Sequence, residues 1–421
     1  MPKSEHRHYT IIMRDSGNNY VGLDIGTDKV RCVVGMVDSE DSSKISILGY
    51  GSSKNIGMRK GVVVHVADVT DSIIAAITEA ERLSGHPIHS ATVNINGSHV
   101  VGLNSQGVIA ISSANREITN EDRYRVEEAA SILQLPPNRE IIQIFSKNYR
   151  LDGQENIKDP VGMNGVRLEV DTHIVSVSTP NLKNLDSALE KAQITPTNHT
   201  VSSLAAAEAV LNRQQKESGT LVLDIGAGTT NLVIIEDGEV QHIAVIPIGG
   251  TNITNDLAIG LKTDLDVAEK VKTEFASLKQ GVIKKESIKV SIRDQIHTFK
   301  TSDIDMIAEA RVEELLEYAD DELKKISRSR KLPGGVVLVG GTSKLPGIAE
   351  FTREKLQLAA RVGKLQSISG LGDKIDDPSF YTCIGLMMLD MYLPHEGNNV
   401  NTKKIQSKTF DFAKTLFNKI K

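Results

Sequence analysis

Apolar and polar positions along the chain follow two periods, one typical of strands and one typical of helices. Short apolar runs that fit strands include VGLDI and RCVVGMV near the start, and LVLDI and LVIIEDG in the second half. Residues 68–87 instead place apolar side chains at helical spacing, and Gly85 and Pro87 close that segment. Residues 303–327 predict a longer helix with one apolar stripe. Strands that alternate with helices favour an α/β fold.

One short pattern occurs twice in the chain. Residues 21–32 read VGLDIGTDKVRC, and residues 221–232 read LVLDIGAGTTNL. Each copy consists of an apolar strand, a turn rich in Gly and Thr or Asp, and a second apolar strand, which is the pattern of a β-hairpin. The repeat therefore predicts two halves, each of which begins with a hairpin.

The segments between the repeated units predict insertions and terminal extensions. We expect two lobes, an inserted α+β subdomain in the first lobe and a smaller subdomain in the second. The expected units are an N-terminal extension (1–19), a first lobe (20–87 and 166–199, with 386–394), an inserted subdomain (88–165), a second lobe (200–254 and 302–385), its smaller subdomain (255–301), a linker (395–404) and a C-terminal helix (405–421).

Composition narrows the class of protein. A chain of 421 residues is long enough for two or more domains. The net charge of −5 and the aromatic content of 4% argue against a nucleic-acid partner. Cys32 and Cys383 are the only cysteines, so we expect a reducing compartment. With neither a long apolar run nor a secretory signal in the start MPKSEHRHYT, we expect a cytoplasmic protein.

The repeated turns carry the residue types that bind phosphate and magnesium. Glycines let backbone N–H groups approach an anion, and threonines add hydroxyl donors. These residues are Gly26, Gly226, Gly228, Thr27, Thr229 and Thr230. Asp24 and Asp224 would face each other across a cleft if the halves pack face to face, and two carboxylates beside bound phosphates suit Mg²⁺. Lys29 could add a positive charge toward the phosphates. The alternative is that both segments are ordinary glycine turns that bind no ligand.

Five segments together resemble the nucleotide-binding pattern of the actin superfamily. DIGTDKV and DIGAGTTNL are similar to its two phosphate loops, TVSSLAAAEAVL and YTCIGLMML to its two interdomain helices, and VLVGGTSKLPGI to its adenosine loop. Within the superfamily the chain resembles the FtsA family of bacterial cell-division proteins, from about residue 20 to residue 393. The resemblance implies an actin-like two-lobed ATPase fold with duplicated ribonuclease H-like halves, ATP and Mg²⁺ as ligands, and at most weak ATPase activity.

The resemblance also implies roles for particular residues. Asp24 and Asp224 would order Mg²⁺ and its waters. The phosphate contacts would be Gly26, Thr27 and Lys29 from one side, and Gly226, Gly228, Thr229, Thr230 and Asn231 from the other. The adenosine neighbours would be Gly340, Gly341, Lys344, Glu269 and Lys272. Asp266 could also cap a helix, with Glu269 reaching back three positions in a capping box. For Glu269 and Lys272 a solvated charged face is the alternative.

One departure from the superfamily bears on hydrolysis. Its chaperones carry a glutamate just before the first interdomain helix, where it helps to position the attacking water. This chain has Ser202 and Ser203 there and no carboxylate before Glu208. A hydroxyl is a poor base near neutral pH, so we expect slow hydrolysis.

The C-terminal segment predicts an interfacial helix. Stepping about 100° per residue gathers its large apolar side chains on one face. Residues 403–421 contain six lysines and one acid, which suits anionic lipid. The expected membrane residues are Phe410, Phe412, Lys414, Leu416, Phe417, Lys419 and Ile420. The alternative is a helix that docks on its own body or on a partner.

The family resemblance implies several partners. These are further copies of the chain in a filament, anionic membrane lipids, later division proteins that meet the inserted subdomain, and the C-terminal peptide of the tubulin-like protein FtsZ at residues 255–301. The expected location is the inner face of the cell membrane at the division site. The alternatives on the same fold are a pilus-assembly scaffold, a small-molecule kinase, which needs a base beside its acceptor hydroxyl, and a chaperone, which needs a peptide-binding domain.

Overall fold

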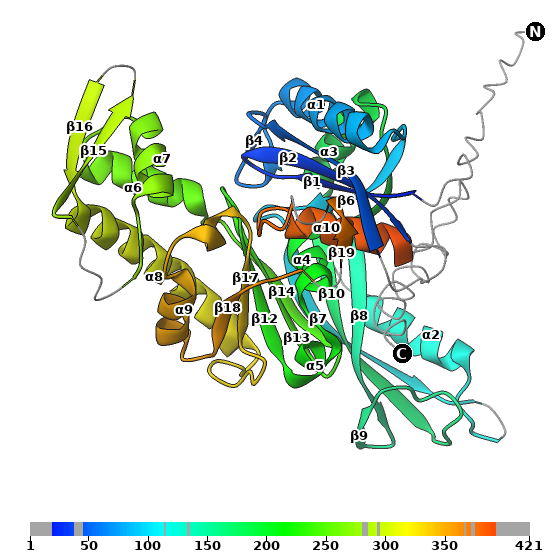
Figure 1. The fold of residues 1–421 in the computed structure, drawn as a ribbon. Coiled ribbons are helices and arrows are strands. Elements are labelled where there is room, and N and C mark those ends of the chain that lie inside the picture. Colours follow the sequence, from blue (N-terminus) through cyan, green and yellow to red (C-terminus); the bar gives the residue numbers. More distant parts are fainter. Residues whose placement is uncertain are drawn as a thin grey trace, which may run out of the picture.

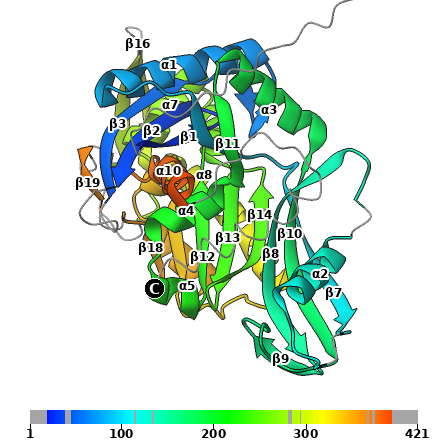
Figure 2. The ribbon, with the colours of Figure 1, turned by 90° about the vertical axis from the view of Figure 1, so that its right-hand side faces the viewer.

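Two lobes face each other, and a smaller sheet extends from one side of the pair (Figures 1 and 2). The computed structural model describes residues 19–37, 45–112, 115–132, 135–279, 285–292, 295–365, 368–371 and 375–392. The expected linker at 395–404 and the expected membrane helix at 405–421 lie outside the described residues. So does the expected N-terminal extension, apart from its last residue.

The first lobe is built on a six-stranded sheet with helices on both faces. Helices α1 (Val66–Ser84) and α3 (Thr179–Lys191) lie side by side on its outer face (Figure 2). The predicted end of α1 at Gly85 is confirmed, since this residue has a left-handed φ of 73°. The strands, in spatial order, are β11 (Thr195–Val201), β6 (Ser90–Ile95), β1 (Asn19–Ile25), β2 (Lys29–Val37), β3 (Ile45–Lys54) and β19 (Ile368–Gly370).

The second lobe repeats this plan on a five-stranded sheet. Its hairpin strands pair antiparallel, and the first of them also pairs parallel with a later strand, as in the first lobe. Helices α8 (Thr301–Lys325) and α9 (Ile348–Leu356) cover the outer face. The strands, in spatial order, are β14 (Glu239–Ile246), β13 (Thr230–Glu236), β12 (Thr220–Ile225), β17 (Val336–Val339) and β18 (Ala360–Val362). Both predicted hairpins and the duplication are therefore present.

Two helices fill the space between the sheets, and both lie where the sequence resembles interdomain helices. Every residue of α4 (Ser202–Val210) is buried, and α10 (Tyr381–Tyr392) crosses it (Figure 2). A Cβ on Gly385 would lie 1.7 Å from the carbonyl oxygen of Ala205. The two helices therefore touch backbone to backbone, and the lobes share one core through them.

We expect Gly385→Ala to destabilise the whole chain, because the added methyl group has no space between the two backbones. Overpacking of a core costs about 1 to 3 kcal/mol, and rigid backbone neighbours put this site near the upper end. Urea unfolding followed by circular dichroism measures the loss. Gly341→Ala is the matched control, since the nearest atom to its added Cβ is 3.9 Å away. Equal stability of the two variants would contradict the close crossing of α4 and α10.

The inserted subdomain is a four-stranded antiparallel sheet with one helix on it. Helix α2 (Asn120–Ser131) begins with a capping box in which Thr119 and Asp122 exchange hydrogen bonds. The strands, in spatial order, are β7 (Val101–Ala110), β10 (Arg167–Ser178), β8 (Arg139–Leu151) and β9 (Gln154–Ile157). A separate small core holds this sheet and helix together.

Two strand assignments at the edges of the inserted subdomain are wrong. Strand β6, expected in the insert at 88–165, pairs parallel with β1 and β11 in the first lobe. Strand β10, expected in the first lobe at 166–199, pairs along its length with β7 and β8 of the insert. Residues 158–166, which contain the expected boundary between 165 and 166, connect β9 to β10 within the insert. Strand pairing is long-range, so local patterns did not reveal it.

The smaller subdomain extends from the far end of the second lobe (Figure 1). It consists of α6 (Gly250–Gly260), α7 (Leu265–Glu274) and a hairpin of β15 (Ser287–Ile292) and β16 (Gln295–Lys300). A second short hairpin, β4 (Met58–Arg59) and β5 (Val62–Val63), lies beside α1. Among the described residues, no helix is both long and apolar enough to cross a bilayer.

Candidate functional site

A cleft of about 720 Å³ lies between the lobes, and both repeated turns line it. The structure brings nearly all of the predicted site residues together in this cleft. They are Asp24, Gly26, Thr27, Lys29, Asp224, Gly226, Gly228, Thr229, Asn231, Glu269, Lys272, Gly340, Gly341 and Lys344. The predicted membrane residues Phe410, Phe412, Lys414, Leu416, Phe417, Lys419 and Ile420 lie outside the described residues.

The two turns have the same local geometry. The backbone N–H of Gly26 donates to the carbonyl of Lys29 at 3.0 Å, and that of Gly226 donates to the carbonyl of Thr229 at 2.9 Å. A Cβ on Gly228 would lie 2.8 Å from the hydroxyl oxygen of Thr27. The turns therefore meet at the base of the cleft, one from each lobe.

Helix α6 begins beside the second turn. The backbone N–H of Gly250 donates to the carbonyl of Gly226 at 2.9 Å, and that of Thr251 donates to the carbonyl of Ala227 at 2.8 Å. Gly250 and Thr251 also line the cleft. The N-terminus of a helix carries a partial positive charge, so this end of the cleft favours an anionic group such as a phosphate.

Thr230 does not line the cleft, and its predicted phosphate contact is wrong. Its hydroxyl is buried and donates to the carbonyl of Ile248 at 2.8 Å. Neighbouring residues on a strand point to opposite sides, so Thr229 and Asn231 face the cleft and Thr230 faces away. Thr230 instead fastens β13 to the segment that leads into α6.

Asp24 and Asp224 lie in the cleft and are each only 7% exposed. Asp24 accepts a hydrogen bond from the side chain of Asn94 at 2.7 Å, and Asp224 accepts one from Thr382 at 3.0 Å. Burial raises the pKa of Asp24 to about 7, with Arg31 opposing and Asp224 adding to the rise. Burial raises the pKa of Asp224 to about 6, with Thr382 and Arg31 opposing. A bound cation would favour the ionised form of both carboxyls.

These shifts predict a pH-dependent stability difference between the wild type and Asp24→Asn. A folded-state pKa raised above the unfolded value means that the folded protein binds the extra proton, so stability falls as pH rises from about 4 to about 7. The amide variant lacks this loss. We therefore expect the melting temperature of Asp24→Asn, minus that of the wild type, to increase from about pH 4 to about pH 7. Above pH 7 this difference should stay constant. Thermal unfolding in EDTA without nucleotide measures this, and a difference independent of pH would contradict it.

The donor set of the cleft fits a magnesium ion that keeps most of its waters. Besides the two aspartates, Asn231 contributes a buried side-chain oxygen with no hydrogen-bond partner. The described residues contain no cluster of three or more His, Cys, Asp or Glu side chains that could enclose a metal. Mg²⁺ is commonly bound by one or two carboxylates together with water and substrate phosphates, and this arrangement supplies such ligands.

The loop after β17 lines the cleft beside the second turn, where the hydroxyl of Thr342 donates to the carbonyl of Gly226 at 3.1 Å. Gly340 has a φ of 84°, and a Cβ there would lie 2.6 Å from a carboxylate oxygen of Asp224. A short 3₁₀-helix, Gly341–Lys344, follows. The ammonium group of Lys344 binds the carboxylate of Asp377 at 2.8 Å, so this lysine is already paired. Glycine at 340 thus lets the loop approach the second aspartate.

Glu269 and Lys272 reach the cleft from α7. The ammonium group of Lys272 donates to Glu269 at 2.6 Å and to the hydroxyl of Thr254 at 2.8 Å. The expected capping box is wrong, because Asp264 is the residue at the helix N-terminus and makes no side-chain cap, while Asp266 lies inside the helix. The ion pair of Glu269 and Lys272 is therefore held by Thr254 of α6, and both residues line the cleft.

Sequence reasoning missed several residues around Asp24. Asn94 also donates to the hydroxyl of Ser202 at 3.0 Å, and Ser202 in turn donates to Asn96 at 2.7 Å. Ser203 is not part of this network, since it donates to a backbone carbonyl of β13. Ser202, at the position of the chaperone glutamate, is thus held by two asparagines. The motif NIN at residues 94–96, where β6 ends, was the signal available in the sequence.

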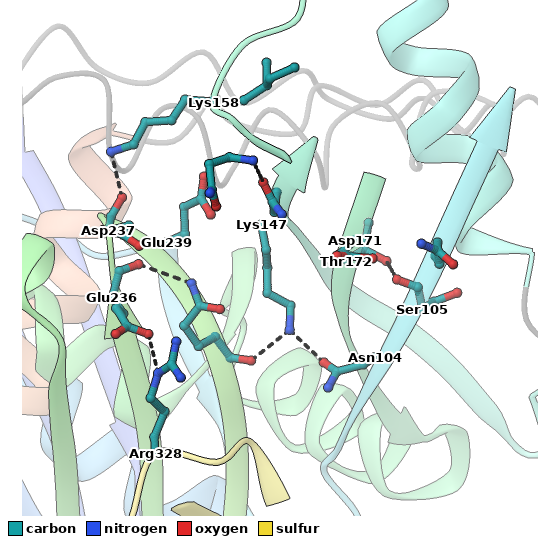
Figure 3. A pocket seen from close by; sticks show the side chains of 15 residues that line it. Asn104, Ser105, Lys147, Lys158, Asp171, Thr172, Glu236, Asp237, Glu239 and Arg328 are labelled. Atoms are coloured by element: carbon teal, nitrogen blue, oxygen red, sulfur yellow. Dashed lines mark hydrogen bonds and ion pairs between the residues drawn. The ribbon is translucent and has the colours of Figure 1, made fainter. Parts of the chain in front are cut away.

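A larger pocket, of about 870 Å³, lies between the insert and the second lobe (Figure 3). Lys147 crosses it and donates to the side chain of Asn104 at 2.9 Å and to the carbonyl of Gln241 at 3.0 Å. Arg328 binds Glu236 at 2.7 Å. The bond from Lys147 to Gln241 fastens the insert to the second lobe, whereas the ion pair of Arg328 and Glu236 lies within that lobe.

This pocket does not suit a polyphosphate. Its walls include the carboxyl groups of Asp171, Glu236, Asp237 and Glu239, and no glycine turn lines it. Burial raises the pKa of Glu239 to about 8, with Lys158 opposing. The smaller cleft is therefore the better phosphate site, because there two glycine turns and a helix N-terminus converge.

The fold and the matched domains define the class of protein. The chain has an actin-like fold. A solved structure of a PilM–PilN type IV pilus biogenesis complex covers 88% of this chain and 98% of its own, with a TM-score of 0.64 and 17% identity. A structure of MreB5 of Spiroplasma citri bound to ADP covers 88% and 96%, with a TM-score of 0.52 and 12% identity.

The sequence matches give the particular family. The family model of the cell division protein FtsA matches residues 221–385, and that of the SHS2 domain inserted in FtsA matches residues 97–176. The cell division protein FtsA of Pseudomonas aeruginosa is 35% identical over 389 residues, which cover 92% of each chain. The chain therefore belongs to the FtsA family of cell division proteins. The match of the inserted domain also agrees with the corrected strands, because it starts after β6 and includes most of β10.

Proposed function

We propose that the chain is an ATP-binding adaptor of bacterial division that polymerises on the cytoplasmic face of the cell membrane, anchors the FtsZ ring there and recruits later division proteins. The proposed binding of ATP rests on one observation. Two equivalent glycine turns, each of which follows a buried aspartate, meet in one cleft. Family membership supports the division part.

The cleft residues would hold the nucleotide from both lobes. Gly26, Thr27 and Lys29 would approach the phosphates from the first lobe, and the second turn with the N-terminus of α6 would do so from the second. Mg²⁺, held through Asp24 and Asp224, would neutralise the phosphate charge. The lobes would then be bridged by the ligand, and binding would favour their closed arrangement.

Hydrolysis would be slow. The first hydroxyl of α4, Ser202, lies in the network around Asp24, where it accepts from the side chain of Asn94 and donates its proton to that of Asn96. It offers no basic group to take a proton from water. The nucleotide would thus set conformation and assembly more than drive turnover, and the chain would be at most a weak ATPase.

Two exposed surfaces support the partner assignments. The smaller subdomain exposes Ile259 (77%) and Ile296 (71%), which offer apolar contacts to the C-terminal peptide of FtsZ. The insert projects from the first lobe, where it would meet neighbouring subunits or later division proteins (Figure 2). The basic, amphipathic segment at 405–421 would bind anionic lipid from the inner face of the membrane.

Co-sedimentation tests the adaptor function. Purified full-length chain, FtsZ of the same organism and vesicles with anionic lipid are centrifuged together, with and without Mg-ATP. We expect FtsZ to pellet with vesicles only when the chain is present, and more of it when ATP is added. Ile259→Ser with Ile296→Ser should keep the chain on vesicles and release FtsZ. FtsZ that stays in the supernatant under all conditions would contradict the proposal.

The pilus-type and kinase alternatives are less well supported. The likeness to PilM, at 17% identity, concerns the fold alone, whereas the relationship to FtsA proteins reaches 35% over nine-tenths of the chain. A kinase of this fold needs a base beside an acceptor hydroxyl. In the cleft the carboxylates Asp24 and Asp224 are the candidates for magnesium, and Glu269 is paired with Lys272.

A further inference from the structure

We propose that His173 is a positioning residue that fixes the angle between the two lobes, because it docks the insert onto the open edge of the second lobe's sheet. Strand β14 forms that edge, since among the described strands it pairs with β13 alone. The docking itself needs no nucleotide, whereas its effect on ATP binding rests on the proposed nucleotide function.

Side chains of the insert bind the backbone of β14 at this edge. The backbone N–H of Ile243 donates to Nε2 of His173 at 3.0 Å, and two residues earlier the carbonyl of Gln241 accepts from Lys147 at 3.0 Å (Figure 3). The side-chain oxygen of Asn104 joins these two bonds, since it accepts from both Lys147 and His173. We call this set of bonds the edge contact. It occupies backbone groups to which a foreign strand could otherwise pair.

His173 makes this contact as a neutral imidazole. A backbone N–H can only donate, so Nε2 carries no proton and Nδ1 holds the proton that is donated to Asn104. The ring is fully buried, and burial together with Lys147 and His242 holds the pKa of His173 well below its usual range. His173 is therefore neutral at physiological pH, and its Nε2 is free to accept from β14.

The insert and the first lobe are built as one body, so the edge contact ties the two lobes together. Strand β10 of the insert ends at Ser178, and α3 of the first lobe begins at the next residue. Val175 and Val177 of β10 are buried in the same core as the first lobe's sheet. The lobes are thus joined at two separate places, the crossing of α4 and α10 and the edge contact. Two joins fix an angle that one join would leave free.

Gly102 of β7 lets the insert approach β14 this closely. A Cβ there would lie 2.4 Å from the carbonyl oxygen of Ile243 and 2.5 Å from Nε2 of His173. Gly102 does not line the nucleotide cleft. Gly102→Ala would therefore push β14 and the insert apart while His173 and the cleft residues stay unchanged.

The edge contact lies one strand away from the second phosphate turn. Three residues beyond Ile243, Ile246 pairs with Thr230, where β13 leaves that turn. Loss of the contact would loosen the angle at which the two turns meet. We expect ATP affinity to fall about fivefold or more, which is the lower end of coupling between sites. Because coupling is reciprocal, ATP should slow exchange of the Ile243 amide by the same factor.

Amide exchange in the full-length protein without nucleotide tests the contact itself. His173→Gln carries its side-chain oxygen to about the position of Nε2, whereas His173→Asn reaches only that of Nδ1 and leaves Ile243 without an acceptor. NMR of protein labelled with 15N-isoleucine follows the Ile243 amide, with Ile234 on β13 as the internal reference. We expect about tenfold faster exchange in His173→Asn and in Gly102→Ala, and a rate close to that of the wild type in His173→Gln.

Spin labels on the two lobes measure the angle. Cys32 and Cys383 are buried, so the labels attach to cysteines introduced by Ala75→Cys on α1 and Glu317→Cys on α8, two exposed positions. The distribution of distances between the labels should be narrow in the wild type and broad in the two variants that break the contact. Circular dichroism with a thermal melt shows that each variant is folded.

Wild-type exchange of Ile243 in both His173→Asn and Gly102→Ala would overturn the proposal. Fast exchange with an unchanged distribution of distances would overturn it as well, because the contact would then not fix the angle. Calorimetric titration with ATP is a separate measurement. Wild-type affinity in both variants would refute the link to the cleft. No ATP binding by the wild type would refute the nucleotide function, while exchange and label distances would still decide the role of His173.

Discussion

Substituting Asp24 and Asp224 together by asparagine is expected to weaken binding of Mg-ATP by about a hundredfold or more, or nearly 3 kcal/mol. The two carboxyls are the buried acidic groups of the cleft, and they reach it from opposite lobes. The amides keep the size and several hydrogen bonds of the side chains, but they remove the charges that hold the cation. Calorimetric titration of the folded double variant measures the loss.

Asp28→Asn provides the matched control for this experiment. Asp28 also lines the cleft, but its side chain is 43% exposed and pairs with Lys54. Exposed ion pairs contribute about 0 to 1 kcal/mol, so this variant should bind ATP within about fivefold of the wild type. A double variant that binds Mg-ATP as tightly as Asp28→Asn would contradict the assigned role of the aspartates.

Deleting residues 405–421 is expected to abolish sedimentation with anionic vesicles while leaving ATP affinity unchanged. Each large apolar side chain contributes at most about 1.5 to 3 kcal/mol when fully buried, so one tail binds reversibly. When many tails are presented along one filament, the first attached tail raises the effective concentration of the others at the membrane. The filament therefore binds far more tightly than a single chain. We therefore expect membrane attachment and filament formation to reinforce each other. Vesicle pelleting and electron microscopy of filaments, carried out separately, measure the two effects.

A shuffled tail separates the helical pattern from the charge. A variant that keeps the composition of residues 405–421 but spreads Phe412, Leu416 and Phe417 around the helix retains every lysine. We expect it to bind vesicles much more weakly than the wild type, because its apolar side chains no longer share a face. Complete sedimentation of the truncated chain would show that another segment attaches the protein to lipid.

Local patterns were sufficient to predict the repeated turns. An apolar strand, a glycine turn and a second apolar strand define a hairpin within a dozen residues, and both hairpins are present. The resemblance to a known family then connected segments far apart in the chain. Every residue that they predicted for the nucleotide site lines the cleft, apart from Thr230, whose side chain lies on the opposite face of β13 from Thr229 and Asn231.

The misplaced features depend on contacts between distant segments. Whether β6 and β10 belong to the lobe or to the insert is decided by their partner strands, which lie up to about a hundred residues away. The expected capping box is absent because α7 begins at Leu265, so that Asp266 lies inside the helix.

The most direct test of the central claim is a crystal structure of the full chain grown with Mg²⁺ and a non-hydrolysable ATP analogue. We expect density for the β- and γ-phosphates between the turns at Gly26 and Gly226, with the metal beside Asp24 and Asp224 and the base near Gly340. A nucleotide bound elsewhere on the molecule, with the space between the two turns holding only solvent, would contradict it.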